Sequence, residues 1–320
     1  MRKTAIWIVA VLIACLAIAL IAPLYMPIPE PEGTQPPRQL ADSDSLFIEI
    51  KEVEIHYKQR GDQEPVLILL HGFLANLDSW QPVMEPLATI GRVIAYDRPA
   101  FGLTERPLVW NGANPYAATT QVDMLIELMD QLGVEQAILV GHSAGGALAA
   151  LAALEHPQRF QALILVDPAI YTQGGNLGLI RLLGAIPQID RIAPLFIRRV
   201  QKWGLDFGRR AWHDPTKLTP EVLARYLRPL RAEHWDRGLW EFTKAAQSLD
   251  LVNRLDELKL PVLVITGDDD RIVPTDESMR LAGELPNADM VVIPNCGHVP
   301  QEECPEQFLQ AVFDYLEGLE

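Results

Sequence analysis

The sequence predicts an α/β fold in which helices cover both faces of a mostly parallel, eight-stranded sheet. Short apolar runs alternate along the chain with longer amphipathic stretches, the pattern of repeated strand and helix units. Three polar residues, Ser143, Asp270 and His298, come just after apolar runs. Because open parallel sheets bind ligands at the carboxyl ends of their strands, we expect these residues to mark a functional site.

The elements are expected in a simple order. Before the longest interruption we expect strands Phe47–Val53, Glu54–Gln59 and Val66–His71, helix Leu77–Ala88, strand Arg92–Asp97, helix Pro115–Leu132, strand Gln136–Val140, helix Ala144–Leu154 and strand Ala162–Val166. After it we expect strand Leu260–Gly267, a helix around Glu277–Leu285, strand Met290–Ile293 and helix Pro305–Leu319.

The pentapeptide Gly141-His142-Ser143-Ala144-Gly145 joins an expected strand to an expected helix. A G-x-S-x-G sequence in that position is typical of a nucleophile elbow, a tight turn that lifts the serine hydroxyl out of the backbone. The N–H of Ala144 then lies near a substrate carbonyl. The alternative is that Ser143 only caps a helix.

A serine nucleophile needs a base and an acid that orients the base. Asp268, Asp269 and Asp270 follow the strand Leu260–Gly267, and His298 follows the strand Met290–Ile293. The chain therefore carries serine, aspartate and histidine in that order, but chemistry alone does not choose among the three aspartates.

These motifs, with Leu69-Leu70-His71-Gly72-Phe73 and Asp97-Arg98-Pro99-Ala100-Phe101-Gly102, resemble those of the α/β-hydrolase superfamily, in its lidded, esterase-like form. The resemblance runs from about Phe47 to the C-terminus. It implies that Ser143 attacks a carbonyl, that His298 is the base, and that Asp270 orients it, because the family's acid is fourth in a G-x-x-D-x-x-x-P pattern. It also implies an oxyanion hole made by the backbone N–H groups of Phe73 and Ala144.

Other polar residues near these motifs are expected to be structural. We expect His71 to brace the oxyanion loop, His142 to point away from Ser143, and Asp97 and Arg98 to fix a turn. Asp167, which follows the strand Ala162–Val166, is a minor alternative for the catalytic acid. The sequence has no H-E-x-x-H metal motif and no Gly-rich phosphate loop, so neither a metal nor a cofactor is expected.

Residues 1–26 form the second distinctive feature, an apolar segment after Arg2 and Lys3. The uncharged run from Thr4 to Pro29 exceeds the 20 or so residues that cross a bilayer. We expect an uncleaved, single-pass signal anchor with the enzyme on the extracytoplasmic side. Two alternatives remain: signal peptide cleavage after Ala17-Ile18-Ala19, or a lipoprotein through the lipobox-like Leu12-Ile13-Ala14-Cys15.

Residues 27–44 are rich in proline and are expected to form a stiff, extended spacer. Such a spacer could hold the enzyme a few tens of Å from the bilayer, at about 3 Å per residue. We expect the hydrolase core at residues 45–170 and 249–320, with one insertion between them.

That insertion, residues 171–248, has helical periodicity and resembles the helical lid of family members. It carries 13 Lys and Arg against 7 Asp and Glu, whereas the whole chain has a net charge of −15. One interpretation is an ordinary lid whose basic residues are solvated. The more specific interpretation is that these basic residues contact anionic lipid headgroups. Apolar residues of this segment that suggest an apolar substrate are Leu182, Leu183, Ile186, Leu195, Phe196 and Trp203.

The predicted function is hydrolysis of an apolar or lipid-like carboxylic ester through an acyl-enzyme on Ser143. The alternatives are a C–C bond hydrolase of ring-cleavage products, a proline iminopeptidase-like peptidase and a cofactor-free perhydrolase. A non-catalytic, membrane-tethered binding protein is the candidate of another class. The acidic composition excludes nucleic acid as an expected partner. Cys296 and Cys304 flank His298, and we expect both to be reduced rather than bridged.

Overall fold

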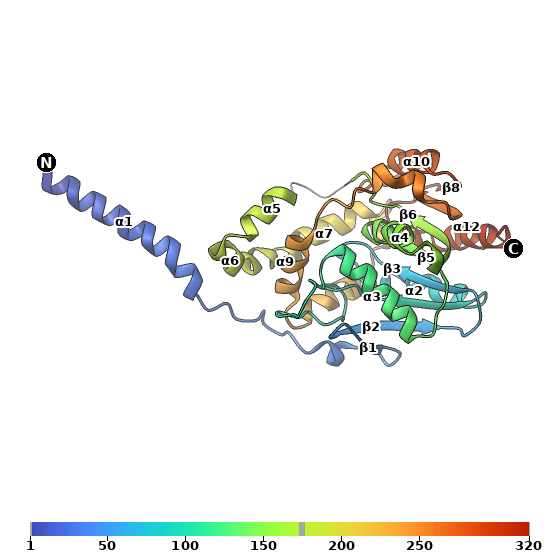
Figure 1. The fold of residues 1–320 in the computed structure, drawn as a ribbon, viewed down its shortest axis with the longest axis horizontal. Helices are drawn as coiled ribbons and strands as arrows, with labels where there is room; N and C mark the ends of the chain where they lie inside the picture. Colours follow the sequence, from blue (N-terminus) through green and yellow to red (C-terminus); the bar gives the residue numbers. More distant parts are fainter. Residues whose placement is uncertain (1, 173–176, 320) are drawn as a thin grey trace.

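The core of the protein is an eight-stranded sheet between two layers of helices (Figure 1). The computed structural model describes residues 2–172 and 177–319. The strands are β1 Leu46–Ile50, β2 Val53–Arg60, β3 Val66–Leu70, β4 Arg92–Tyr96, β5 Ala137–His142, β6 Phe160–Val166, β7 Val262–Gly267 and β8 Ala288–Ile293. Their order is β1-β2-β4-β3-β5-β6-β7-β8, and only the β1–β2 and β2–β4 pairs are antiparallel. The predicted fold class is confirmed.

Each face of the sheet has its own apolar core, because alternate residues of a strand point to opposite faces. In β3, Ile68 packs with helices α3 (Ala118–Gln131), α4 (Ala144–Glu155) and α10 (Thr275–Glu284). The neighbouring Leu69 packs on the other face with α2 (Gln81–Leu87) and α12 (Pro305–Glu317). This double cover fixes the strand ends that carry the candidate site.

Two predicted boundaries were wrong for local reasons. The first hairpin turns at Lys51 and Glu52, both with positive φ, and not between Val53 and Glu54. Two consecutive residues of that conformation make the tight turn that matches strand twist. Helix α3 begins at Ala118 instead of Pro115, because the Asn114 side chain accepts from the Tyr116 N–H in a turn before the helix.

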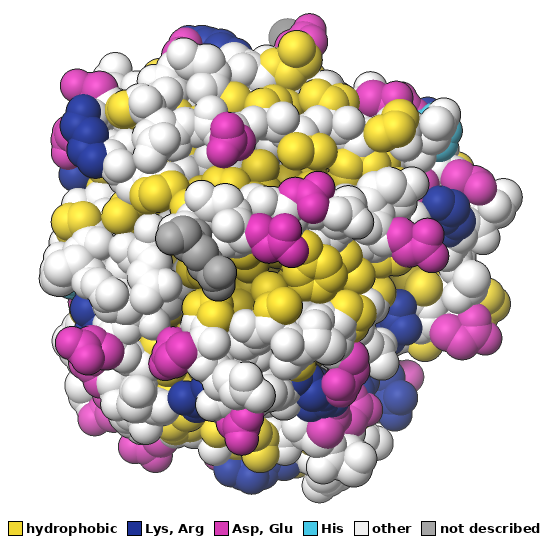
Figure 2. Space-filling model, turned by 90° about the vertical axis from the view of Figure 1, so that its right-hand side faces the viewer, with side chains coloured by type: hydrophobic (Ala, Val, Ile, Leu, Met, Phe, Trp, Pro, Cys, Tyr) yellow, Lys and Arg dark blue, Asp and Glu magenta, His cyan; other side chains and the backbone are white. Residues whose placement is uncertain are grey.

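Between β6 and β7 the described chain forms five helices, here called the helical insertion: α5 Leu177–Gly184, α6 Pro187–Ile197, α7 Val200–Ala211, α8 Pro220–Leu227 and α9 Trp235–Ala245. Trp212, Trp235 and Trp240 are buried. The side chain of Trp203 lies outside the described residues. In Figure 1 α5, α6 and α9 lie on the side of the core that faces the N-terminal helix. The opposite end of the core carries scattered Asp and Glu side chains (Figure 2).

The N-terminal segment is one long helix, α1 Arg2–Tyr25, which extends away from the core (Figure 1). Its Thr4–Tyr25 part is long and apolar enough to cross a membrane, and none of it is buried in the protein. Helix α6 contacts α1: the side chain of Gln188 donates to the backbone oxygen of Leu20 (2.9 Å).

Residues 27–44, predicted to form a stiff, extended spacer, contact the helical insertion. The Glu30 carboxylate accepts from both the N–H and the ring of His234, and Arg198 donates to the oxygen of Pro29. Gln35 forms a two-bond bridge with the backbone on either side of Ala232. The backbone N–H and C=O groups of an extended segment need hydrogen-bond partners from outside it, and residues of the insertion provide some of them. The segment therefore holds the insertion close to α1.

Candidate active site

Ser143 stands at the sharp turn between β5 and α4. Its backbone has φ 53° and ψ −119°, a strained conformation for a residue with a side chain. The turn needs glycine around it: a Cβ on Gly141 would lie 2.6 Å from the oxygen of Gly145, and one on Gly145 would lie 2.3 Å from the oxygen of Leu70. This geometry places the Ser143 side chain at the carboxyl edge of the sheet.

His298 lies in the loop after β8, and its Nδ1 is 2.6 Å from Oδ2 of Asp270, which follows β7. A carboxylate only accepts, so Nδ1 carries the proton and Nε2 is left as the base. The other oxygen of Asp270 accepts from the N–H groups of Ile272 and Val273. No hydrogen bond joins the Ser143 hydroxyl to His298 in the described chain, a bond that unliganded enzymes often form only with substrate.

The three consecutive aspartates have different partners. Asp268 accepts from the N–H of Cys296, and Asp269 pairs with His213 and Arg271. Of the three, Asp270 is the one bonded to His298, so the geometry singles out the residue that the resemblance implied.

Asp167 lies beside Asp270 but does not bond to His298. Its Oδ1 accepts from the Thr266 hydroxyl and the Gly267 N–H. Complete burial, together with the charge of Asp270, raises its pKa well above the usual range. Burial therefore disfavours the ionised form of Asp167, which suits it poorly to stabilise a charged imidazole.

His142, expected to point away from Ser143, contacts His298 instead. Its Nε2 is 2.7 Å from the backbone oxygen of His298, and the two rings lie 4.8 Å apart. Burial lowers the pKa of His142 well below its usual value, so the ring is neutral and donates through Nε2. His142 thus fixes the backbone of the loop that carries His298.

His71 braces the oxyanion loop as expected. Its Nδ1 donates to the oxygen of Gly72 (2.8 Å), and its Nε2 accepts from the N–H of Arg98 (3.1 Å). Burial lowers the pKa of His71 to about 3, so Nε2 stays an acceptor at neutral pH. The N–H groups of Phe73 and Ala144 have no acceptor among the described residues.

Asp97 fixes the turn after β4, whereas the Arg98 side chain does not. The Asp97 carboxylate accepts from the N–H groups of Leu77 and Leu103 and bonds Nδ1 of His56 at 2.6 Å. These bonds hold its pKa at about 2 although burial opposes ionisation. The buried guanidinium of Arg98 forms no such bond.

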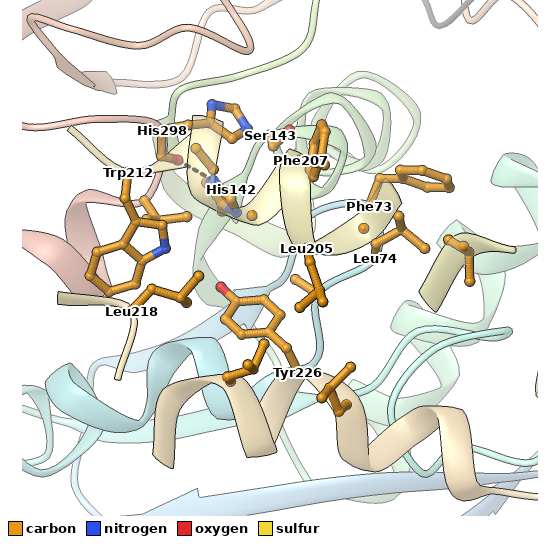
Figure 3. Close-up of a pocket in the computed structure, with 18 of the residues that line it drawn as sticks. Phe73, Leu74, His142, Ser143, Leu205, Phe207, Trp212, Leu218, Tyr226 and His298 are labelled. Carbon is orange, nitrogen blue, oxygen red and sulfur yellow. Dashed lines mark hydrogen bonds between the residues drawn. The ribbon is translucent and has the colours of Figure 1, made fainter. Parts of the chain in front are cut away.

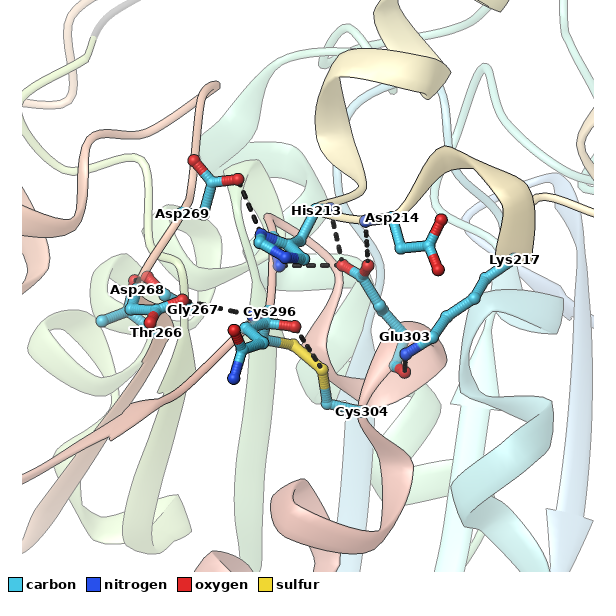
Figure 4. Close-up of a disulfide and its surroundings, with 12 residues drawn as sticks. His213, Asp214, Lys217, Thr266, Gly267, Asp268, Asp269, Cys296, Glu303 and Cys304 are labelled. Carbon is cyan, nitrogen blue, oxygen red and sulfur yellow. Dashed lines mark hydrogen bonds and ion pairs between the residues drawn. A yellow bond between two sulfur atoms is a disulfide. The ribbon is translucent and has the colours of Figure 1, made fainter.

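The His298 loop is tied to the helical insertion through Glu303 of α11 (Pro300–Glu303). The buried carboxylate of Glu303 accepts from the N–H groups of His213, Asp214 and Gly297 at 2.7 to 2.9 Å (Figure 4). The N–H of His298 also donates to the oxygen of Ala211 at the end of α7 (2.6 Å). The insertion therefore positions a residue of the core site.

Cys296 and Cys304 form a disulfide, so the expectation that both are reduced was wrong (Figure 4). The short helix α11 folds the chain back and brings the two Cα atoms to 6.3 Å, within the range that a disulfide spans. The bridge closes the loop that contains His298.

Two cavities meet at Ser143, and both are also lined by Phe73 and Phe207. The smaller, about 110 Å³, contains His298 and is closed by residues of the insertion, among them Trp212 and Tyr226 (Figure 3). The larger, about 500 Å³, contains Ala144 and runs along α3, α4 and α9. Most of the wall of each cavity is apolar. The sequence pointed to Ser143, Asp270 and His298, but it missed Phe207, Glu303 and Ala211, which carry no motif.

Two groups of side chains could in principle hold a metal ion, His142 with Asp167 and His298, and Glu303 with Cys296 and Cys304. The second offers no thiolate, because both sulfurs are in the disulfide. The first contains His298, the residue that a proton transfer from Ser143 would use.

Comparison with known proteins gives a consistent picture. A family model described as the alpha/beta hydrolase fold matches residues 65–305. A 2-hydroxy-6-oxononadienedioate/2-hydroxy-6-oxononatrienedioate hydrolase of Paraburkholderia phymatum is 30% identical over 83% of the chain and 91% of the relative. An uncharacterized hydrolase of Bacillus subtilis, YugF, is 28% identical over 82% of the chain and 92% of that protein.

Among solved structures, a bacterial membrane phospholipase A aligns with 100% of this chain and 99% of its own, at 25% identity and a TM-score of 0.66. An esterase of Thermogutta terrifontis aligns with 87% of this chain and 99% of its own, at 24% identity and a TM-score of 0.70.

Proposed function

Because this chain belongs to the alpha/beta hydrolase family, we propose that it is a membrane-anchored serine hydrolase that cleaves carboxylic esters of apolar acyl chains. One observation carries the proposal: an imidazole oriented by a buried carboxylate lies with Ser143 where two apolar cavities meet. That arrangement provides a nucleophile, a base and room on both sides of a scissile bond.

In the proposed reaction His298 Nε2 takes the proton of Ser143 as its oxygen attacks the carbonyl carbon. The N–H groups of Phe73 and Ala144 stabilise the oxyanion, each by about 3 kcal/mol in the transition state. His298 then returns the proton to the leaving oxygen, and an acyl group remains on Ser143. Water, deprotonated by the same imidazole, attacks the acyl-enzyme and releases the acid.

The two cavities suggest how the ester lies. The leaving oxygen must face His298, so we assign the alcohol part to the smaller cavity, which His298 lines. The acyl part then occupies the larger cavity beside Ala144, whose volume of about 500 Å³ suits a medium or long chain.

The proposed location is the extracytoplasmic face of the cell membrane, with α1 retained as a single-pass anchor. Support comes from the apolar span of α1 and from its contact with α6, which a cleaved segment would not maintain. Cleavage as a signal peptide or lipoprotein remains the alternative. Intact mass of the membrane-extracted protein separates these outcomes.

We further propose that the insertion rests on anionic lipid headgroups. On α5 and α6 the exposed apolar side chains of Leu182 and Phe196 lie among exposed Arg181 and Arg191, with exposed Arg199 just after α6, the helix that contacts α1. Each arginine near such a surface contributes about 1 kcal/mol. Purified protein whose α1 has been removed should float with vesicles containing anionic lipid more than with neutral vesicles; equal binding would contradict the proposal.

The relatives named as C–C hydrolases of nonadienedioates make that reaction the second candidate. The test is to assay the full-length protein in detergent on p-nitrophenyl esters from C2 to C16 and on a dienedioate ring-cleavage product. Turnover that rises toward medium or long chains supports the ester hydrolase. Turnover of the dienedioate with negligible ester cleavage would replace it with the second candidate.

A further inference from the structure

Two buried arginines follow β4, and they differ in the hydrogen-bond partners of their guanidinium groups. Arg106 and Arg98 are each 3% exposed. The guanidinium of Arg106 donates to the backbone oxygens of Thr104 (2.9 Å) and Gly102 (2.5 Å). In Arg98, Nε and Nη2 are buried with no hydrogen-bond partner. No ion pair in the described chain includes Arg98.

A buried cation without partners is costly, and native proteins seldom keep one without a reason. The nearest acid in sequence, Asp97, is already used by two backbone N–H groups and by His56. The Phe101 ring, 5.3 Å from the Arg98 guanidinium, offers a cation–π contact but no hydrogen-bond acceptor. Arg98 therefore has no acidic partner among the described residues.

The position of Arg98 in the wall of a cavity indicates that a bound molecule could provide its anionic partner. Arg98 lines the larger cavity, the one that also contains Ser143 and Ala144, and none of the described residues lining it is acidic. Gln121 also lines this cavity; its side-chain nitrogen donates to the backbone oxygen of Tyr116, and its side-chain oxygen is buried without a partner among the described residues. Burial lowers the pKa of Arg98 to about 10, so the group is still charged at neutral pH.

We propose that Arg98 binds a carboxylate borne on the acyl part of the substrate, so that the favoured ester has an apolar chain ending in an acid group. The proposal rests on the proposed ester hydrolysis and narrows its substrate class. The planar guanidinium can make two parallel hydrogen bonds to a carboxylate, and exclusion of water in an apolar cavity strengthens them. The apolar walls then hold the chain between the two ends.

The test uses the full-length protein in detergent, because α1 contacts the insertion. Mono-p-nitrophenyl esters of the diacids from succinate to suberate are compared with uncharged isosteres; for adipate this is p-nitrophenyl 6-methylheptanoate. We expect a preference of about tenfold or more in kcat/KM for the charged ester at one or more lengths. No preference at any length would overturn the inference.

The variant Arg98→Met should lower kcat/KM for the favoured charged ester by about 10- to 100-fold, mainly through KM, and leave the isostere within about threefold. Arg106→Met is the matched control: it removes a buried arginine that does not line the cavity, and it should affect charged and uncharged esters alike. An equal loss on both esters in Arg98→Met would assign Arg98 a structural role and contradict the inference.

A binding experiment keeps the inference separate from catalysis. Calorimetry on Ser143→Ala should show binding of at least one dicarboxylate of the series, weaker binding of its diamide, and no dicarboxylate binding once Arg98→Met is added. If wild type hydrolyses neither class of ester, the proposed function fails, and dicarboxylate binding still decides on Arg98. Absence of binding for every dicarboxylate would overturn the inference even if esters are cleaved.

Discussion

The core and the helical insertion contribute different parts of the candidate site. The core supplies the residues of the proposed chemistry from the ends of its strands and the loops that follow them, and backbone N–H groups of the core hold the Asp270 carboxylate. The insertion supplies most of the wall of the smaller cavity and contacts α1. The comparison teaches that changes to Ser143, Asp270 or His298 in the core should alter the rate for every substrate, whereas changes to residues that line the cavities, most of which lie in the insertion at the smaller cavity, should alter which substrate is used.

The largest effect is expected from Asp270→Asn in the core. An amide leaves His298 in the wrong tautomer, so kcat should fall by about 10⁴-fold for short and long esters alike. Steady-state kinetics on C2 and C8 esters measure this. Asp269→Asn is the control, because Asp269 bonds to His213 and Arg271, not to His298; it should stay within about tenfold of wild type. The reverse ranking would assign the acid to Asp269.

Glu303→Ala tests the link between the two regions. The N–H groups of His213, Asp214 and Gly297 would lose their acceptor, and the buried one, on Gly297, would alone cost about 1–3 kcal/mol of stability. We expect a lower Tm and, because the His298 loop loosens, a fall in kcat of about 10- to 100-fold. The exposed Glu306→Ala in the next helix should change neither quantity. An unchanged kcat in Glu303→Ala would mean that the insertion does not position His298.

Ala246→Trp tests the insertion alone. Ala246 directly follows α9 and lines the larger cavity, so an indole there should shorten the space for an acyl chain. We expect kcat/KM to fall by about 10- to 100-fold for C8 and longer esters, with C2 nearly unchanged. A uniform loss across chain lengths would break the division of roles between core and insertion.

The smallest effect concerns the contact of Glu302 with Tyr226 of the insertion. Burial raises the pKa of Glu302 to about 8, while the Tyr226 hydroxyl donates to its Oε1. Between pH 4.5 and 8 the folded state keeps a proton that the unfolded chain releases, so this group makes the free energy of unfolding fall as pH rises, by at most about 1.4 kcal/mol per pH unit. Glu302→Gln should flatten that slope in denaturant titrations from pH 5 to 9. A slope equal to that of wild type would show that Glu302 is ionised in the folded protein.

The sequence predicted the core well because each strand and its following polar residue form a local pattern. The pentapeptide around Ser143 and the strand before Asp270 are readable without tertiary contacts. The insertion was less predictable. Phe207 and Ala246 line the cavities only because of how α7 and α9 pack on the core, and no motif marks them.

Long-range pairings explain the contacts that the sequence did not predict. The disulfide depends on the turn of α11, which brings Cys304 back to Cys296. The docking of residues 27–44 depends on partners such as Arg198 and His234, far along the chain. The role of His142 depends on a backbone oxygen of His298. In each case the deciding contact joins segments whose approach the local sequence does not encode.

The most direct test of the central claim is to react the full-length protein with a fluorophosphonate and map the adduct by mass spectrometry. We predict one stoichiometric adduct on Ser143, loss of ester turnover in parallel, and no adduct in Ser143→Ala. A protein that turns over esters while Ser143 stays unmodified, or one in which Ser143→Ala keeps its activity, would contradict the claim that Ser143 is the nucleophile.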